Sequence, residues 1–135
     1  FADDDIHARA KELEDCIQQA AAQDRHMSNR PPEIVYQGFM AEGFALADME
    51  NAAEPISLLG QCHEQVYGAA LKQSVITGTT DARFFGLYAN TPGLVYGPRA
   101  VDVHGFNEWV DLESVRKSTQ ASALFMANWC GLDKI

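Results

Sequence analysis

The sequence contains no cluster of basic residues, and its charge is one-sided. Ten lysines and arginines stand against nineteen aspartates and glutamates, so the formal net charge is -9 at pH 7. A chain of this sign repels the phosphate backbone of nucleic acids and the headgroups of anionic membranes. We therefore expect no nucleic acid and no membrane among its partners.

Long apolar runs are also missing. A membrane-spanning helix needs roughly 20 consecutive apolar residues, and no segment approaches that length. Residues 1–5 lack the basic start and the apolar stretch of a secretory signal. We therefore expect a cytoplasmic protein.

Cysteine is scarce and scattered. Cys16, Cys62 and Cys130 lie far apart, are odd in number and never form a C-x-x-C pair. This pattern argues against both a disulfide framework and a zinc-thiolate site. We interpret the three as small buried apolar residues. The rest of the composition, with 47% apolar and 21% charged residues among 135, is typical of a globular chain of one domain or parts of two.

The first forty residues predict one helix and one strand. Within residues 3–23, apolar positions recur at steps of three and four, as on one face of a helix. These positions are Ile6, Ala10, Leu13, Ile17 and Ala20. After the breaker segment 28–32, residues 33–37 are rich in β-branched and aromatic side chains and predict a strand. One helix over one strand leaves the strand edges unpaired, so this part does not close a core alone.

The second part of the chain predicts an α/β fold. Residues 40–53 show no clean period, and we place a domain boundary there. Pro55 suits the first turn of a helix that ends at Gly68. Two short strands, residues 74–77 and 93–96, are then joined through a helix at residues 82–88. Strands connected by such a crossover are normally parallel.

A last helix is predicted between Asp111, a good N-cap residue, and Gly131, a good stop. Six residues, all apolar except one threonine, recur on one side at the spacing of a helix. They are Leu112, Val115, Thr119, Ala123, Met126 and Trp129.

Two loops leave the carboxyl ends of the predicted strands, where open α/β sheets bind ligands. The loop from Gly78 to Asp81, which includes Thr79, offers N–H and hydroxyl donors that suit an anionic group. The alternative is that Asp81 or Thr80 only caps the following helix.

The loop of residues 97–108 carries His104, and imidazole is the commonest zinc ligand. A lone histidine is more often structural, and no H-x-D or H-x-x-x-H spacing gives it a partner. We assign no chemical role to His7, His26 or His63.

Three segments, taken in order, resemble one family. They are residues 76–85 (ITGTTDARFF), 92–98 (PGLVYGP) and 104–110 (HGFNEWV). Together they resemble the dinuclear-zinc amidohydrolases and aminoacylases, which include acetylornithine deacetylase, succinyl-diaminopimelate desuccinylase and carboxypeptidase G. The acetylornithine deacetylase branch looks most similar, because residues 108–112 (EWVDL) and 128–132 (NWCGL) match its style.

The resemblance extends over essentially the whole chain and implies a division into two parts. Residues 1–40 correspond to the C-terminal helix and strand of an α+β, ferredoxin-like lid, through which such enzymes dimerise. Residues 41–135 correspond to the C-terminal part of a zinc-peptidase-like α/β catalytic domain. We therefore expect a homodimer in the complete enzyme.

The resemblance also implies site residues. His104 corresponds to the family's final zinc ligand. Gly78 and Thr79 correspond to the loop that binds the substrate carboxylate, and Asp81 supports that loop. The complete enzyme holds two zinc ions, with cobalt as the alternative metal. The family's H-x-D motif, bridging aspartate and paired glutamates are not among these 135 residues.

These implications predict the C-terminal portion of a zinc-dependent deacylase that acts on N-acyl amino acids and is inactive by itself. A second hypothesis is a non-catalytic domain that keeps the fold for dimerisation or regulation. A third is a small carboxylate-binding module built on residues 78–81.

Overall fold

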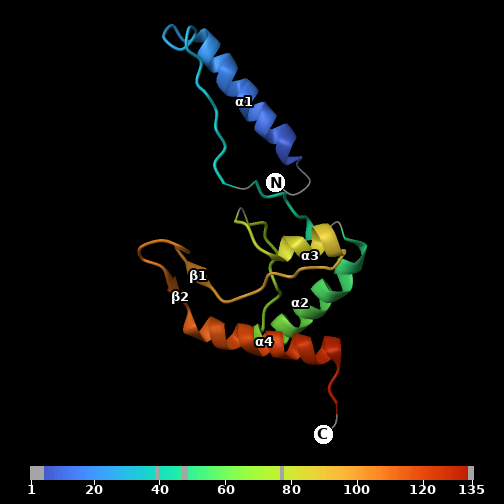
Figure 1. The fold of residues 1–135 in the computed structure, drawn as a ribbon. Coiled ribbons are helices and arrows are strands. Elements are labelled where there is room, and N and C mark those ends of the chain that lie inside the picture. The colour runs from blue at the N-terminus through green and yellow to red at the C-terminus, as the bar shows by residue number, and fades with distance from the viewer. Residues whose placement is uncertain (1–4, 39, 47–48, 77, 134–135) are drawn as a thin grey trace. The chain divides into compact units, whose positions relative to one another are not determined.

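The computed structural model describes residues 5–38, 40–46, 49–76 and 78–133. The chain divides into two compact units, Phe1–Ala45 and Leu46–Ile135, and each is described by itself. Figure 1 shows the elements along the chain. The assignment of these units to a lid and a catalytic domain stays a prediction.

The first unit contains helix α1, Ile6–Gln23 (Figure 1). Asp5 caps its N-terminus, since Oδ1 accepts hydrogen bonds from the backbone N–H groups of His7 at 2.8 Å and Ala8 at 3.1 Å. The helix predicted over residues 3–23 is therefore confirmed in type and in its end, with its start at Ile6. Residues 3 and 4 lie outside the described part of the chain.

The strand predicted over residues 33–37 is wrong. This segment has no regular structure and no strand partner among the described residues. Two side-chain bonds connect its neighbourhood to α1 instead, from Gln18 Nε2 to the Pro32 carbonyl at 3.0 Å and from Tyr36 Oη to the Ala10 carbonyl at 3.1 Å. β-Branched residues favour a strand only where a neighbouring strand forms hydrogen bonds with their backbone and packs against their side chains. Val35 lacks such packing, since it is 67% exposed.

The second unit is built on two helices, α2 (Ala53–Tyr67) and α4 (Leu112–Cys130), which pack against each other (Figure 1). A short 3-10 turn, η2 (Glu50–Ala52), precedes α2. Gly68 ends α2 with φ of 72°, a left-handed conformation that suits glycine. Both helices agree with the sequence predictions, including Asp111 as the N-cap of α4.

The contact between α2 and α4 is made by small side chains. Ser114, Ser118 and Ala121 recur at i, i+4 and i+7 on α4 and are buried, as are Leu59 and Cys62 on α2. Small residues allow two helices to approach closely. The apolar side of α4 noted in the sequence is a different side, because Leu112, Met126 and Trp129 are 77%, 57% and 49% exposed.

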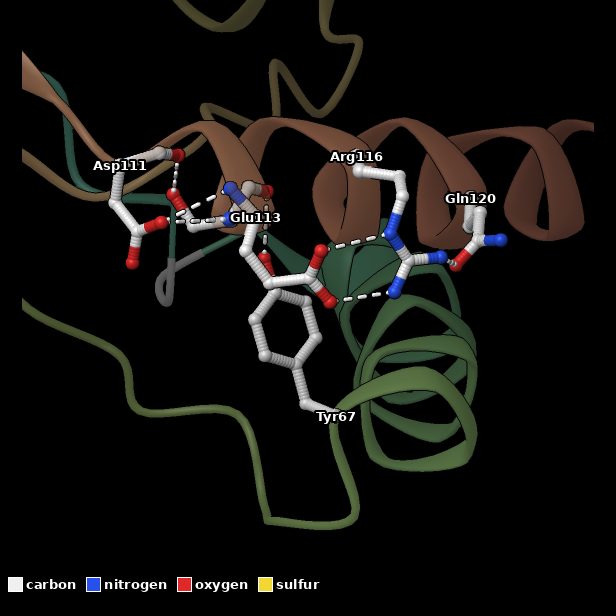
Figure 2. Close-up of polar contacts among 6 residues, drawn as sticks. Tyr67, Asp111, Glu113, Arg116 and Gln120 are labelled. Carbon is white, nitrogen blue, oxygen red and sulfur yellow. Dashed lines mark hydrogen bonds and ion pairs between the residues drawn. The ribbon is translucent and has the colours of Figure 1, made fainter.

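The exposed side of α4 also carries a short polar chain (Figure 2). Arg116 donates from Nη2 to Glu113 Oε1 at 2.5 Å and from Nη1 to Gln120 Oε1 at 3.0 Å. The Glu113 and Arg116 side chains are both more than half exposed, so this pair contributes little to stability.

The parallel strands predicted at residues 74–77 and 93–96 are wrong for the described residues, which form no strand at 74–76 or 93–96. Thr77 lies outside the described part of the chain. The helix between them is confirmed as α3, Ala82–Ala89. Among the described residues, these segments have no neighbouring strand to pair with, so their apolar composition alone does not make a ladder.

A small antiparallel sheet that the sequence did not predict lies just before α4. It pairs β1, Ala100–Val101, with β2, Trp109–Val110, in the register Ala100↔Val110 and Val101↔Trp109 (Figure 1). The helices and this sheet are compatible with an α/β class.

The cysteines follow only part of the expectation. All three are free, but only Cys62 is buried, whereas Cys16 on α1 and Cys130 at the end of α4 are exposed. The prediction that all three are buried is therefore wrong, because neither exposed cysteine lies on the packed side of its helix. In the described part of the chain, every helix is too short or too polar to cross a membrane.

Candidate functional site

His104 lies in the loop of residues 102–108, which joins β1 to β2, and is exposed. Its φ of 67° and that of Asp102, 52°, place both residues in the left-handed region. For a residue other than glycine this conformation costs roughly 1–2 kcal/mol. The loop therefore holds the histidine in a backbone state that a free chain seldom adopts.

A tight turn produces this conformation. The Gly105 N–H donates to the Asp102 carbonyl at 2.6 Å. A Cβ at residue 105 would lie only 2.7 Å from that same oxygen, so any other side chain would force the turn open. Gly105 thus fixes the backbone beside His104, the metal ligand implied by the family resemblance.

The hairpin is joined directly to α4. Asp111 follows β2 and caps the helix, since its Oδ1 accepts from the N–H of Glu113 at 2.9 Å and of Ser114 at 3.3 Å (Figure 2). On the opposite strand, the Arg99 guanidinium lies 5.7 Å from the centre of the Trp109 ring. The base of the hairpin is therefore held from both strands.

The second predicted loop contains Gly78, Thr79 and Asp81, all exposed. Asp81 precedes α3 but its side chain makes no cap hydrogen bond. Thr80 Oγ1 accepts from the Ala82 N–H at a long 3.4 Å. The capping alternative thus applies to Thr80 and not to Asp81, while Gly78 and Thr79 remain predicted substrate-binding residues.

The described residues do not form a metal site. Among them, no three His, Cys, Asp or Glu side chains are close enough to hold an ion. No hydrogen bond or ion pair between described residues connects His104 with Gly78, Thr79 or Asp81. A hydrolytic zinc site takes about three protein ligands and one open position. His104 alone would supply one of them.

A polar and aromatic cluster lies elsewhere in the second unit. His63 Nδ1 and Tyr96 Oη are 2.9 Å apart, and the His63 ring stacks on Tyr67 with centroids 4.1 Å apart. Burial raises the pKa of the Tyr96 phenol to about 12, with the neighbouring Tyr67 adding to the shift. His63 was assigned no role from the sequence. The spacing of His63 and Tyr67, i and i+4 on one helix, was the available signal.

A hollow of about 600 Å³ lies beside the contact of α2 and α4. Its lining includes Glu54, Ser57, Gln61, Asn128 and Trp129. None of the residues predicted to bind metal or substrate lines it, so it does not belong to the predicted site.

No curated protein matches the chain. The sequence model of peptidase family M20/M25/M40 matches residues 33–128, a stretch that includes both predicted loops. Since this match covers well over half of the 135 residues, the chain belongs to peptidase family M20/M25/M40, whose members are metal-dependent hydrolases.

Proposed function

We propose that this chain is the C-terminal part of a zinc-dependent amidohydrolase that removes acyl groups from N-acyl amino acids, of the acetylornithine deacetylase type. The observation that carries the proposal is the family match over residues 33–128, which spans the motif around His104. In this proposal His104 is a metal ligand, while Gly78 and Thr79 bind the substrate carboxylate and Asp81 supports their loop.

The geometry of the hairpin supports the role of His104. The imidazole is exposed, so an ion can reach it, and Gly105 fixes the backbone of the turn beside it. The remaining ligands are not found among the described residues. They come from another part of the enzyme, so we derive no chemical step from this chain alone.

The same proposal includes the predicted partner and location. Residues 1–40, within the unit Phe1–Ala45, would belong to the lid through which the complete enzyme dimerises in the cytoplasm. Zinc would be the metal, two ions in the complete enzyme, with cobalt as its substitute.

A second candidate function is a non-catalytic dimerisation domain. It is favoured by the exposed apolar side of α4, where Leu112, Met126 and Trp129 have large exposed fractions. Sedimentation of the chain without metal distinguishes the two, because a dimerisation domain forms a defined dimer without zinc.

Complementation tests the enzymatic proposal. The chain is mixed with the separately produced N-terminal segment of an acetylornithine deacetylase, which carries the H-x-D motif, and zinc is added. We expect zinc-dependent release of acetate from N-acetylornithine and a shift of the His104 ring resonances. His104→Ala should lower the release at least 100-fold.

His26→Ala is the matched control, since His26 is also exposed but lies outside the predicted site. It should leave acetate release unchanged. Release that persists at the wild-type rate in His104→Ala, or a mixture in which zinc has no effect on either release or the His104 resonances, would count against the proposal.

A further inference from the structure

The hairpin that carries His104 ends in a pair of opposite residues, here called a rung, whose hydrogen bonds are unusual. The register of β1 and β2 makes Arg99 and Asp111 the next pair after Ala100 and Val110. In an antiparallel pair of this kind, each residue donates its N–H to the carbonyl of the other. Here Asp111 N donates to the Arg99 carbonyl at 3.0 Å, which is half of such a rung.

The other half of the rung runs through a side chain. The Arg99 N–H donates to Ser114 Oγ at 2.9 Å, and Ser114 Oγ donates to the Asp111 carbonyl at 2.7 Å. The serine hydroxyl therefore stands between the two backbone groups that would otherwise bond directly. It links both strands of the hairpin to the first turn of α4.

Ser114 is itself held firmly. It is 8% exposed on the side of α4 that packs against α2. Its carbonyl accepts from Tyr67 Oη at 3.0 Å, so the tyrosine of α2 reaches the same turn (Figure 2). The hydroxyl is thus a fixed point in the packed helix pair.

Apart from the Asp111 cap, few contacts orient the hairpin relative to α4. The hairpin contains only two paired residues on each strand, and Trp109 and Val110 are 47% and 42% exposed. Two-stranded ribbons of this size are marginally stable at best on their own, and their twist is larger than in wider sheets. The Ser114 hydroxyl and the neighbouring backbone bond therefore set the direction in which the loop leaves α4.

We infer that Ser114 is a positioning residue, which fixes the His104 hairpin relative to α4 by completing the Arg99–Asp111 rung. This inference rests on the proposed function only for the role of His104 as a metal ligand. Without the hydroxyl, the Arg99 amide either loses its acceptor or bonds to Asp111 directly after the strands move together. Either change turns the loop away from its present direction.

Nuclear magnetic resonance of the whole chain tests this without metal. In the wild type, the Arg99 amide should exchange with solvent as slowly as the Asp111 amide, although no backbone carbonyl accepts from it. An Arg99 amide that exchanges like an unprotected one overturns the inference, whatever the variants show.

Variants then test the orientation. In Ser114→Ala we expect the exchange rate of the Arg99 amide to rise at least tenfold. The residual dipolar couplings of residues 100–110 should no longer fit the alignment tensor that fits α4. Ser114→Thr keeps the hydroxyl and should restore both. Ser118→Ala is the matched control, because it removes an equally buried serine of α4 whose Oγ bonds only within the helix, to the Val115 carbonyl.

Wild-type couplings and exchange in Ser114→Ala would overturn the inference, as would an equal change in Ser118→Ala. In the complementation assay, Ser114→Ala should lower acetate release and Ser118→Ala should not. If no mixture releases acetate, the proposed function fails, while the couplings still decide the role of Ser114.

Discussion

His63 and Tyr96 are joined by a hydrogen bond of 2.9 Å between Nδ1 and Oη, although 33 positions separate them in the sequence. The bond connects α2 to the segment between α3 and β1, which has no regular structure of its own. The His63 ring also meets Tyr96 edge-on, with centroids 5.8 Å apart. This contact helps fix the segment that leads into the hairpin.

The raised pKa of Tyr96 predicts a loss of stability in alkali. The phenol has a pKa of about 12 in the folded chain and near 10 in an unfolded one. As the pH rises, the unfolded chain therefore loses the phenol proton of Tyr96 at a lower pH than the folded chain does. The contribution of Tyr96 is complete below about pH 10 and falls as the pH rises toward about 12. Unfolding by denaturant at several alkaline pH values measures it.

Tyr96→Phe should remove this alkaline component and cost about 1 kcal/mol at neutral pH through the lost bond to His63. Tyr88→Phe serves as the control, since Tyr88 is 70% exposed. The same alkaline loss in Tyr96→Phe as in the wild type would show that another group causes it.

The helices were predictable because their signals are local. Asp111 caps α4 and Gly68 ends α2 through interactions within one or two turns, which the sequence displays directly. The strands were not predictable in the same way. Val75 and Val95 are β-branched, as strand residues often are, yet both are largely exposed because no strand of the described part of the chain lies beside them.

In the candidate site, too, local features were predictable and features that depend on distant residues were not. The turn at Gly105 and the exposed position of His104 follow from neighbouring residues. The two-residue strands on either side left no periodic signal, since a strand is recognised from an alternation over roughly 4–8 residues. The bridge through Ser114 depends on the register of those strands and the packing of α4, so the sequence alone did not predict it.

Asp111 should stabilise both α4 and the hairpin base. Asp111→Ala removes the acceptor of the Glu113 and Ser114 amides, and the loss of such a cap costs about 1 kcal/mol. Thermal unfolding followed by circular dichroism measures this. Asp111→Asn should retain most of the stability, and Asp133→Ala, at an exposed carboxylate beyond α4, should have no effect. Equal losses in Asp111→Ala and Asp133→Ala would argue against the cap.

Asp5 should make α1 sensitive to acid. Hydrogen bonds from the Ala8 and His7 amides lower the pKa of its carboxyl below the ordinary value. The folded state therefore holds the charged form more strongly than the unfolded state does. This contribution is present above about pH 4 and is lost as the pH falls through the lowered pKa. Helical content measured from neutral pH downward should fall less steeply in Asp5→Asn, while an unchanged acid transition would point to other carboxyls.

The two sides of α4 should respond differently to substitution. Ala121 is fully buried against α2, so Ala121→Leu overfills the contact and should cost about 1–3 kcal/mol. Met126→Gln lies on the exposed apolar side and should change stability by less than about 0.5 kcal/mol. Denaturant unfolding compares the two.

The exposed side should instead control association. Leu112→Gln combined with Met126→Gln shrinks the apolar surface, so the chain should bind less hydrophobic dye and sediment more nearly as a monomer. If the double variant keeps a defined dimer, the dimer uses another surface and α4 is not the dimerisation face. The double variant could instead lose both the dimer and the acetate release with the N-terminal segment. In that case the same side of α4 contacts the N-terminal segment, because a surface that faces only solvent would tolerate glutamine.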